Sequence, residues 1–174
     1  MIGSLVTVPA RERPDLLGQS VAAAVARDET PEMFVAEIDP ALADTAAFCE
    51  RYEVDLDVSA NCVVVAGRRG GETRFAACVV LATTRADVNG VVRRRIDARK
   101  ASFAPMELAV AETGMEYGGI TPVGLPESWP LLVDKAVVTR PYVVIGSGLR
   151  RSKLVLAGAD LARLPGAEVL ALTG

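Results

Sequence analysis

Histidine is absent from all 174 residues of this chain. The side chain that most often serves as a general base, and that most often ligates metals, is therefore missing. A Ser-His-Asp triad, a Cys-His pair or a histidine-based zinc site cannot be built from this sequence. We expect the protein to need no metal and no other cofactor.

Cysteine is scarce, and its pattern indicates burial. Cys49, Cys62 and Cys78 are odd in number, lack Cys-x-x-Cys spacing, and two of them lie in apolar strand-like runs. Small buried thiols are common in such runs. The alternative is a nucleophilic Cys62 or Cys78, which would need a lysine or arginine to lower the pKa of its thiol.

Long apolar stretches are also missing. The longest, residues 62–66 and 75–82, are far shorter than a bilayer requires, and residues 1–10 lack the basic start and apolar centre of a signal peptide. We expect a cytoplasmic protein with no membrane partner. Because 51% of the residues are apolar, we predict one core and a single domain over residues 1–174.

An excess of positive charge is absent, since the net charge is −3. We therefore expect no indiscriminate binding to DNA. Five cations are nevertheless concentrated within eight residues, where Asp97 is the one opposite charge: Arg93, Arg94, Arg95, Arg99 and Lys100. This run could contact phosphates, or it could be the solvated face of a helix.

The spacing of apolar residues predicts an α+β fold. Helices are expected over residues 14–25, 42–52, 87–96, 102–114 and 160–164. Strands are expected over residues 33–38, 62–66, 74–82, 131–138, 142–145, 153–156 and 169–172. Residues 67–72, Gly-Arg-Arg-Gly-Gly-Glu, suit an antiparallel hairpin. We predict a mixed, largely antiparallel sheet with flanking helices.

Glycine-rich turns mark the second half of the chain. The first, residues 118–124, reads Gly-Gly-Ile-Thr-Pro-Val-Gly, and it fits neither a dinucleotide fingerprint nor a P-loop. One interpretation is a loop that connects a helix to a strand, with Pro122 fixing a turn. The other is a nest of exposed backbone amides that polarises a carbonyl or holds an oxyanion.

The second glycine turn, Gly146-Ser147-Gly148-Leu149-Arg150-Arg151, divides two predicted strands. A tight hairpin explains it, although Arg150 or Arg151 could also grip a phosphate. Ser147 is a poor nucleophile because no histidine could activate it. Lys100 is open to two interpretations as well, an ordinary surface cation or a desolvated amine that faces a site.

Taken in order, these features resemble the YbaK and prolyl-tRNA-synthetase-associated editing-domain family. The similarity extends from about Ala60 to Ala171, and residues 1–59 match only loosely. It rests on these segments in register: Asn61-Cys62-Val63-Val64-Val65, Asp87-Val88-Asn89, Lys100-Ala101-Ser102, Gly114, residues 118–124, Val133-Asp134 and residues 146–150.

The resemblance implies an aminoacyl-tRNA deacylase that acts in trans, on the ester of a mischarged tRNA that a synthetase has released. The amino acid would be small, such as Ala, Cys, Ser or Thr, with tRNA-Pro as one candidate carrier. A second site that hydrolyses such errors is needed, because a synthetase pocket distinguishes amino acids that differ by one methylene only ~10–200-fold. The partners implied are the mischarged tRNA and, as an option, a synthetase.

The resemblance also implies a mechanism and a set of site residues. Amides around Gly118 and Gly119 would polarise the acyl carbonyl while a group of the substrate helps water to attack. The implied catalytic residues are Gly118, Gly119, Asn61 and Lys100. The implied substrate-binding residues are Ile120, Thr121, Pro122, Val79, Gly146, Ser147 and Gly148. The implied tRNA-binding residues are Arg93, Arg94, Arg95 and Arg150.

One departure from the family pattern leaves alternatives open. Many members of the family carry a lysine at the start of the first core strand, where this chain has Asn61. Either activity is retained, with Lys100 supplying the cation, or the chain is a non-catalytic binder of aminoacyl-tRNA or of a synthetase. A third hypothesis is a small-molecule-binding module that uses the apolar cavity.

Overall fold

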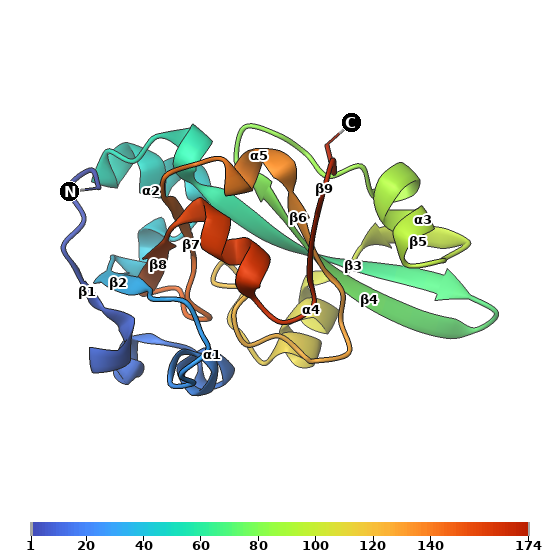
Figure 1. Cartoon of the computed structure of the whole chain (residues 1–174), viewed down its shortest axis with the longest axis horizontal. Helices are drawn as coiled ribbons and strands as arrows, with labels where there is room; N and C mark the ends of the chain where they lie inside the picture. Colours follow the sequence, from blue (N-terminus) through green and yellow to red (C-terminus); the bar gives the residue numbers. More distant parts are fainter. Residues whose placement is uncertain (1, 174) are drawn as a thin grey trace.

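The computed structural model describes residues 2–173, and its strands form two sheets (Figure 1). The four-stranded sheet has the order β1-β2-β8-β7 and the five-stranded sheet the order β5-β3-β4-β6-β9. The strands are β1 (Thr7–Pro9), β2 (Phe34–Glu37), β3 (Ala60–Arg69), β4 (Glu72–Leu81), β5 (Lys100–Phe103), β6 (Leu131–Asp134), β7 (Val143–Gly146), β8 (Ser152–Leu156) and β9 (Ala167–Leu170).

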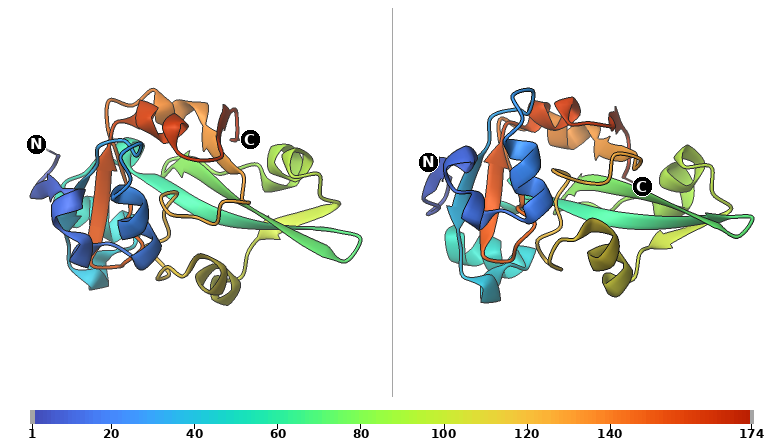
Figure 2. Two further views of the ribbon diagram at one scale, coloured as in Figure 1. Left: turned by 60° about the horizontal axis from the view of Figure 1, so that its bottom comes forward. Right: turned by 90° about the horizontal axis from the view of Figure 1, so that it is seen from below.

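Helices flank both sheets, as Figure 2 shows from two further sides. The α-helices are α1 (Gln19–Val25), α2 (Thr45–Tyr52), α3 (Arg93–Arg95), α4 (Met106–Thr113) and α5 (Lys135–Val138). A π-helical turn, η5 (Val88–Val92), leads into α3. The short 3-10 helices are η1 (Ala10–Glu12), η2 (Pro14–Leu16), η3 (Pro40–Leu42), η4 (Leu56–Val58) and η6 (Gly158–Arg163). No helix within residues 2–173 is long and apolar enough to cross a membrane.

The predicted hairpin is the longest feature of the fold. β3 and β4 pair antiparallel over ten residues each and extend as a twisted ribbon beyond the rest of the molecule (Figure 1). Gly70 and Gly71 form its two-residue turn with φ of 58° and 82°. Positive φ at both positions is what a type I′ turn requires, and only glycine adopts it without strain.

The α+β prediction is confirmed, and the sheets are mixed. β6 pairs parallel with β4 and with β9, whereas every other strand pairing is antiparallel. Alternating residues of β3 and β4 face two separate cores. Val64, Ala77 and Val79 pack toward α1 and the loops before β6, while Val65, Cys78 and Val80 pack toward η5 and α3.

Some predicted boundaries are wrong, each for a local reason. The strand expected over residues 131–138 ends at Asp134, whose carboxylate accepts a hydrogen bond from Ala136 N and starts α5. Ser102 does not open a helix, because it lies in β5 and α4 begins only after Pro105. Asp87 does cap a helical turn as expected, accepting hydrogen bonds from Gly90 N and Val91 N.

Candidate functional site

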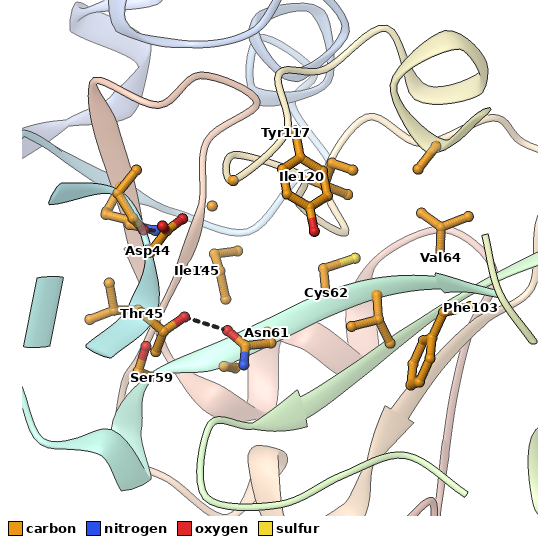
Figure 3. Close-up of a pocket in the computed structure, with 18 of the residues that line it drawn as sticks. Asp44, Thr45, Ser59, Asn61, Cys62, Val64, Phe103, Tyr117, Ile120 and Ile145 are labelled. Carbon is orange, nitrogen blue, oxygen red and sulfur yellow. Dashed lines mark hydrogen bonds between the residues drawn. The ribbon is translucent and has the colours of Figure 1, made fainter. Parts of the chain in front are cut away.

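A cavity of about 540 Å³ lies where the two sheets meet, beside the first half of β3. Figure 3 shows Asn61, Cys62 and Val64 on β3 below Tyr117 and Ile120, with Ile145 of β7 between them and Asp44. The volume is within the usual range for small-molecule sites. Strands of both sheets and the first glycine loop therefore contribute walls to one pocket.

The pocket exists because β5 pairs with only the second half of β3. The β5 register covers Val65 to Arg68, and Ala104 N donates to Val64 O just before it. Backbone groups alternate along a strand, so the N–H and C=O of Cys62 face the same edge as Val64 O. On the far side of the gap, a single parallel bridge joins Ser59 to Val144. Cys62 thus presents its backbone N–H to the cavity at an uncovered strand edge.

Asn61 lines the pocket, as the sequence predicts for a site residue. Its Oδ1 accepts a hydrogen bond of 2.8 Å from Thr45 Oγ1 at the start of α2 (Figure 3). This bond fixes the orientation of the amide and leaves its NH₂ group as the remaining donor. Asn61 brings hydrogen-bonding capacity to the pocket but no charge.

Lys153 supplies the positive charge that the side chain of Asn61 does not carry. It lies on β8, lines the same cavity, and is only 8% exposed. Its Nζ donates to Ala43 O at 2.9 Å and lies 5.2 Å from the centroid of the Phe48 ring. Burial lowers the pKa of Lys153 to about 8, with Arg150 acting in the same direction and with Cys49 and Asp44 opposing it. One hydrogen bond uses one of three ammonium donors, so two are available to a ligand.

The first glycine loop is tied to the second by backbone hydrogen bonds. Glu116 N donates to Gly148 O at 3.0 Å, and Gly148 N donates to Gly119 O at 2.6 Å. Gly119 N donates to Glu116 O at 2.9 Å, so this amide is already engaged. Within residues 2–173, Gly118 N has no such acceptor, and Gly118 lines the cavity. Of the two amides expected to polarise a carbonyl, only that of Gly118 is therefore free to do so.

The two glycine loops approach each other so closely that glycine is required where their backbones meet. A Cβ at Gly119 would lie 2.7 Å from the carbonyl of Leu149, and one at Gly146 would lie 2.6 Å from the carbonyl oxygens of Gly119 and Ile120. Such distances are not seen for real side chains, so any larger residue must displace the loops. The two glycine turns that stand out in the sequence are thus two halves of one packed junction.

Charged groups stand at the rim of the pocket. Arg150 Nη1 donates to Tyr117 O at 3.0 Å and lies 3.7 Å from Asp44 Oδ1. Arg150 N donates to Glu116 Oε1 at 2.7 Å. Arg150 therefore holds the glycine loop against the start of α2, and the carboxylate of Asp44 lines the cavity with 77% of its side chain exposed.

Cys62 also lines the cavity, with its sulfur directed into it in Figure 3. Burial raises the pKa of its thiol far above the ordinary value, and Cys78 beside it adds to the increase. No cation lowers it, so the thiol stays protonated at neutral pH and is a poor nucleophile. Cys62 therefore forms part of the apolar wall of the cavity and does not act as a nucleophile.

Several other residues expected at the site lie elsewhere. Lys100 is exposed on β5, opposite Arg68, and it does not line the cavity. Val79 is fully buried in the core, and Pro122 lines a second cavity beside α1. Ile120 and Gly146 do line the pocket.

Three further residues of the glycine segments, Ser147, Gly148 and Thr121, are buried in the junction. Ser147 Oγ accepts from Ser152 Oγ at 2.6 Å, and the serine is fully buried. Gly148 packs against Gly18, with a Cβ at Gly148 lying 3.0 Å from Gly18 Cα. Thr121 is fully buried too, and its hydroxyl has no partner within residues 2–173. These residues support the loops and do not line the pocket.

The basic run lies toward the other end of the ribbon from this pocket, on α3 and at the start of β5 (Figure 1). Arg95 pairs with Glu168 of β9, and Arg93 Nε donates to Asn89 O at 2.8 Å. Arg94 is exposed. The arginine run and the cavity are therefore separate surfaces of the same sheet.

Sequence reasoning missed two charged residues of the site, Asp44 and Lys153, and Lys153 carries the clearer signal. It stands beside Leu154, Val155 and Leu156 in a strand that is buried throughout. A lysine in an apolar run is the signal that could have identified it, since lysine is almost never buried without a partner or a role. The expected strand began at residue 153, which made this lysine resemble an exposed terminal residue.

This cavity at a strand edge combines the free amides of Gly118 and Cys62 with the buried amine of Lys153. Such a set of donors is suited to polarising a carbonyl. The model of the aminoacyl-tRNA editing domain matches residues 39–164. The chain therefore belongs to the aminoacyl-tRNA editing domain family. The matched segment begins well before residue 60, so η3 and α2 belong to the family unit as well.

Solved structures share the fold at low sequence identity. A protein described as a candidate trans-editing enzyme for prolyl tRNA synthetase is 22% identical with a TM-score of 0.69, covering 80% of this chain and 85% of its own. A hypothetical protein is 21% identical with a TM-score of 0.71, covering 80% and 90%. A scaffold used for computational epitope grafting is 22% identical with a TM-score of 0.70, covering 82% and 87%.

Proposed function

We propose that this protein is a trans-acting deacylase that hydrolyses the ester of a mischarged aminoacyl-tRNA. The observation that carries the proposal is the buried Lys153 amine in a cavity whose lining residues all lie within residues 39–164, the segment that the editing-domain model matches. An ammonium group held in an apolar cavity costs stability, and such groups concentrate at functional sites. Membership of the family supplies the substrate class, and the neighbour named as a trans-editing enzyme supports action on released tRNA.

The pocket offers a partner for each polar part of an aminoacyl ester. The ester carbonyl would accept hydrogen bonds from Lys153 Nζ, Gly118 N and the edge amide of Cys62. The α-ammonium group of the amino acid would pair with the carboxylate of Asp44, and the ribose with the amide of Asn61. Preorganised donors of this kind contribute ~10²–10³ each to the rate of acyl transfer.

The side chain of the amino acid would lie against the apolar wall of Cys62, Val64 and Ile120. Water attacks the polarised carbonyl, and the bond between the carbonyl carbon and the ribose oxygen breaks. The attacking water loses its proton to a group of the substrate, since no imidazole is available in this chain, and the departing ribose oxygen takes up that proton to become a hydroxyl. Ala, Cys, Ser and Thr are the amino acids whose size suits such a second sieve.

The test is single-turnover deacylation of a panel of mischarged tRNAs, beginning with tRNA-Pro. A pocket-filling variant, Ala104→Phe, should abolish hydrolysis, because Ala104 lines the cavity. The matched control, Ala171→Phe, alters an exposed alanine of the C-terminal segment and should leave hydrolysis unchanged. Failure of the native protein to hydrolyse any member of the panel would reject the proposal.

A second candidate, a non-catalytic aminoacyl-tRNA or synthetase binder, is favoured by Asn61 at the lysine position of the family. Asn61→Lys distinguishes the two. If the native protein binds the panel without turnover and Asn61→Lys creates hydrolysis, binding is its function. If the native protein hydrolyses an ester and Asn61→Lys merely changes the rate, deacylation stands.

A further inference from the structure

A second cavity, of about 340 Å³, lies between α1, the loop before β6 and the end of η6. Its volume is near the lower end of the range for small-molecule sites, so it suits a small ligand. Within residues 2–173, no residue lines both this cavity and the first one. Ile120 lines the first and Pro122 the second, so the two are separate sites that share the glycine loop.

The walls of the second cavity are apolar and stiff. Trp129 and Leu131 line it and are only 8% and 1% exposed. Four further lining residues are prolines, whose rings fix φ: Pro31, Pro122, Pro126 and Pro165. A cavity with such walls is largely formed before a ligand arrives, which lowers the entropic cost of binding.

Close backbone contact orders the two sides of this cavity. Gly124 has a φ of 81°, and a Cβ there would lie 2.6 Å from Ser20 O of α1. Thr30 Oγ1 donates to Ala24 O at 2.6 Å and holds the turn that follows α1. The loop before β6 and the end of α1 are therefore fixed against each other.

Charged residues of both signs line the cavity: Arg27, Arg163, Glu29 and Glu127. Two cations and two anions cancel, so neither a simple anion nor a simple cation is favoured. Arg163 is paired with Asp160 at 3.1 Å. Within residues 2–173, the other three form no ion pair, although they line the same cavity. Unpaired charges of both signs beside apolar walls suit a small zwitterion with an apolar side chain.

We propose that the second cavity binds a free α-amino acid with an apolar side chain. Its carboxylate would pair with Arg27, its ammonium group with Glu29 or Glu127, and its side chain would pack against the wall of Trp129 and Leu131. Residues 122–127 line this cavity, so the ligand would contact the continuation of the loop that carries Gly118. This binding does not depend on the proposed deacylase function.

Trp129 gives a direct measurement of occupancy. It is the only tryptophan of the chain, and it lines the second cavity and not the first. Titration of the native protein with leucine should give a saturable change in tryptophan fluorescence. Glycine should bind at least about 10-fold more weakly, because it has no side chain to bury. The absence of a saturable change up to about 10 mM leucine would overturn the proposal, and so would equal affinity for glycine.

Two analogues of leucine separate the charged contacts. Isocaproate lacks the ammonium group, and leucinamide lacks the carboxylate. Arg27→Gln should weaken the binding of leucine and isocaproate by at least about 5-fold and leave that of leucinamide unchanged. Glu29→Gln combined with Glu127→Gln should weaken leucine and leucinamide and leave isocaproate unchanged. All three residues are exposed, so these variants should fold.

The controls distinguish the second cavity from the first. Arg94→Gln and Glu112→Gln alter exposed charges that line neither cavity, and both should bind leucine like the native protein. A free amino acid could also enter the first cavity, as the product of ester hydrolysis. Ala104→Phe, which fills that cavity, should therefore bind leucine as the native protein does.

Loss of the leucine signal in Ala104→Phe would place the amino acid in the first cavity and overturn the proposal. Equal effects of the charge variants on all three ligands would overturn it as well. None of these measurements requires turnover, so a failure here rejects the second site alone, whereas leucine binding without any deacylation rejects the enzymatic function alone.

Discussion

Replacing Lys153 by methionine should separate the stability of this protein from its activity. The fall in the pKa of Lys153 from 10.5 to about 8 means that its protonated form is disfavoured in the folded protein. One pKa unit corresponds to about 1.4 kcal/mol, so the charged amine destabilises the fold by roughly 3 kcal/mol. Methionine removes this cost but leaves Ala43 O without its donor, a loss of about 1–3 kcal/mol.

The two effects nearly cancel at neutral pH. We expect the free energy of unfolding of Lys153→Met to equal that of the native protein or to exceed it by up to about 2 kcal/mol. Deacylation should nevertheless fall by ~10²–10³, the usual effect of losing one preorganised donor. Single-turnover hydrolysis and urea unfolding of the same preparation measure both quantities. Lys135→Met, at an exposed lysine of α5, is the matched control and should change neither.

The pH dependence gives a second signature. Below pH 8 Lys153 is protonated in both folded and unfolded chains and contributes no slope. Between pH 8 and 10.5 the unfolded chain holds this proton and the folded chain loses it, so native stability should rise with pH by up to about 3 kcal/mol. Lys153→Met should lose this rise. Native hydrolysis should decline above pH 8 as the ammonium group is lost.

Two results would refute this reasoning. One is hydrolysis by Lys153→Met within a few-fold of the native rate. The other is an unchanged rise in stability between pH 8 and 10.5 in that variant, because some other group would then be responsible.

Further outcomes follow from the same geometry. Gly119→Ala should lower the free energy of unfolding, measured in urea, by about 1–3 kcal/mol, because its Cβ would meet the Leu149 carbonyl. Native-like stability of this variant would contradict the packed junction. Cys62→Ala should keep hydrolysis within a few-fold, because burial holds the pKa of the thiol high; a loss above ~100-fold would indicate a covalent role. Thr45→Val removes the hydrogen bond that orients the Asn61 amide, so it should lower stability by about 1 kcal/mol and slow hydrolysis several-fold. Unaltered hydrolysis in this variant would show that Asn61 takes no part in the mechanism.

Sequence patterns predicted the hairpin and the fold class because local chemistry determines them. Gly70 and Gly71 form a tight turn, and the apolar, valine-containing runs on either side of it pair as strands. β5 was missed because Lys100-Ala101-Ser102-Phe103 has no strand periodicity of its own. It is a strand because β3 offers a free edge at Val65 to Arg68, a circumstance that depends on the tertiary fold.

The sequence pointed to Gly118, Gly146 and Asn61, which line the cavity, and it did not point to Lys153. Lys100 was expected between two helices and Lys153 at the start of a strand, and sequence alone does not tell which of the two amines is buried away from water. The difference arises from α2, because Ala43 O and the Phe48 ring enclose Nζ of Lys153 from a segment more than a hundred residues earlier. Sequence alone likewise does not tell which glycine amide is free. The amide of Gly119 donates to Glu116 O within a turn, whereas that of Gly118 has no such acceptor within residues 2–173.

The contact between Gly18 and Gly148 limits how this domain can be cut or transplanted. Gly18 N donates to Ser147 O at 2.9 Å, and β2 pairs with β8 along the strand that carries Lys153. Both partners precede residue 39, outside the family-matched segment. A minimal fragment of residues 39–164 would expose the edge of β8 and loosen the glycine junction. Any chimera that borrows this editing domain must therefore carry the first thirty-eight residues of the chain along.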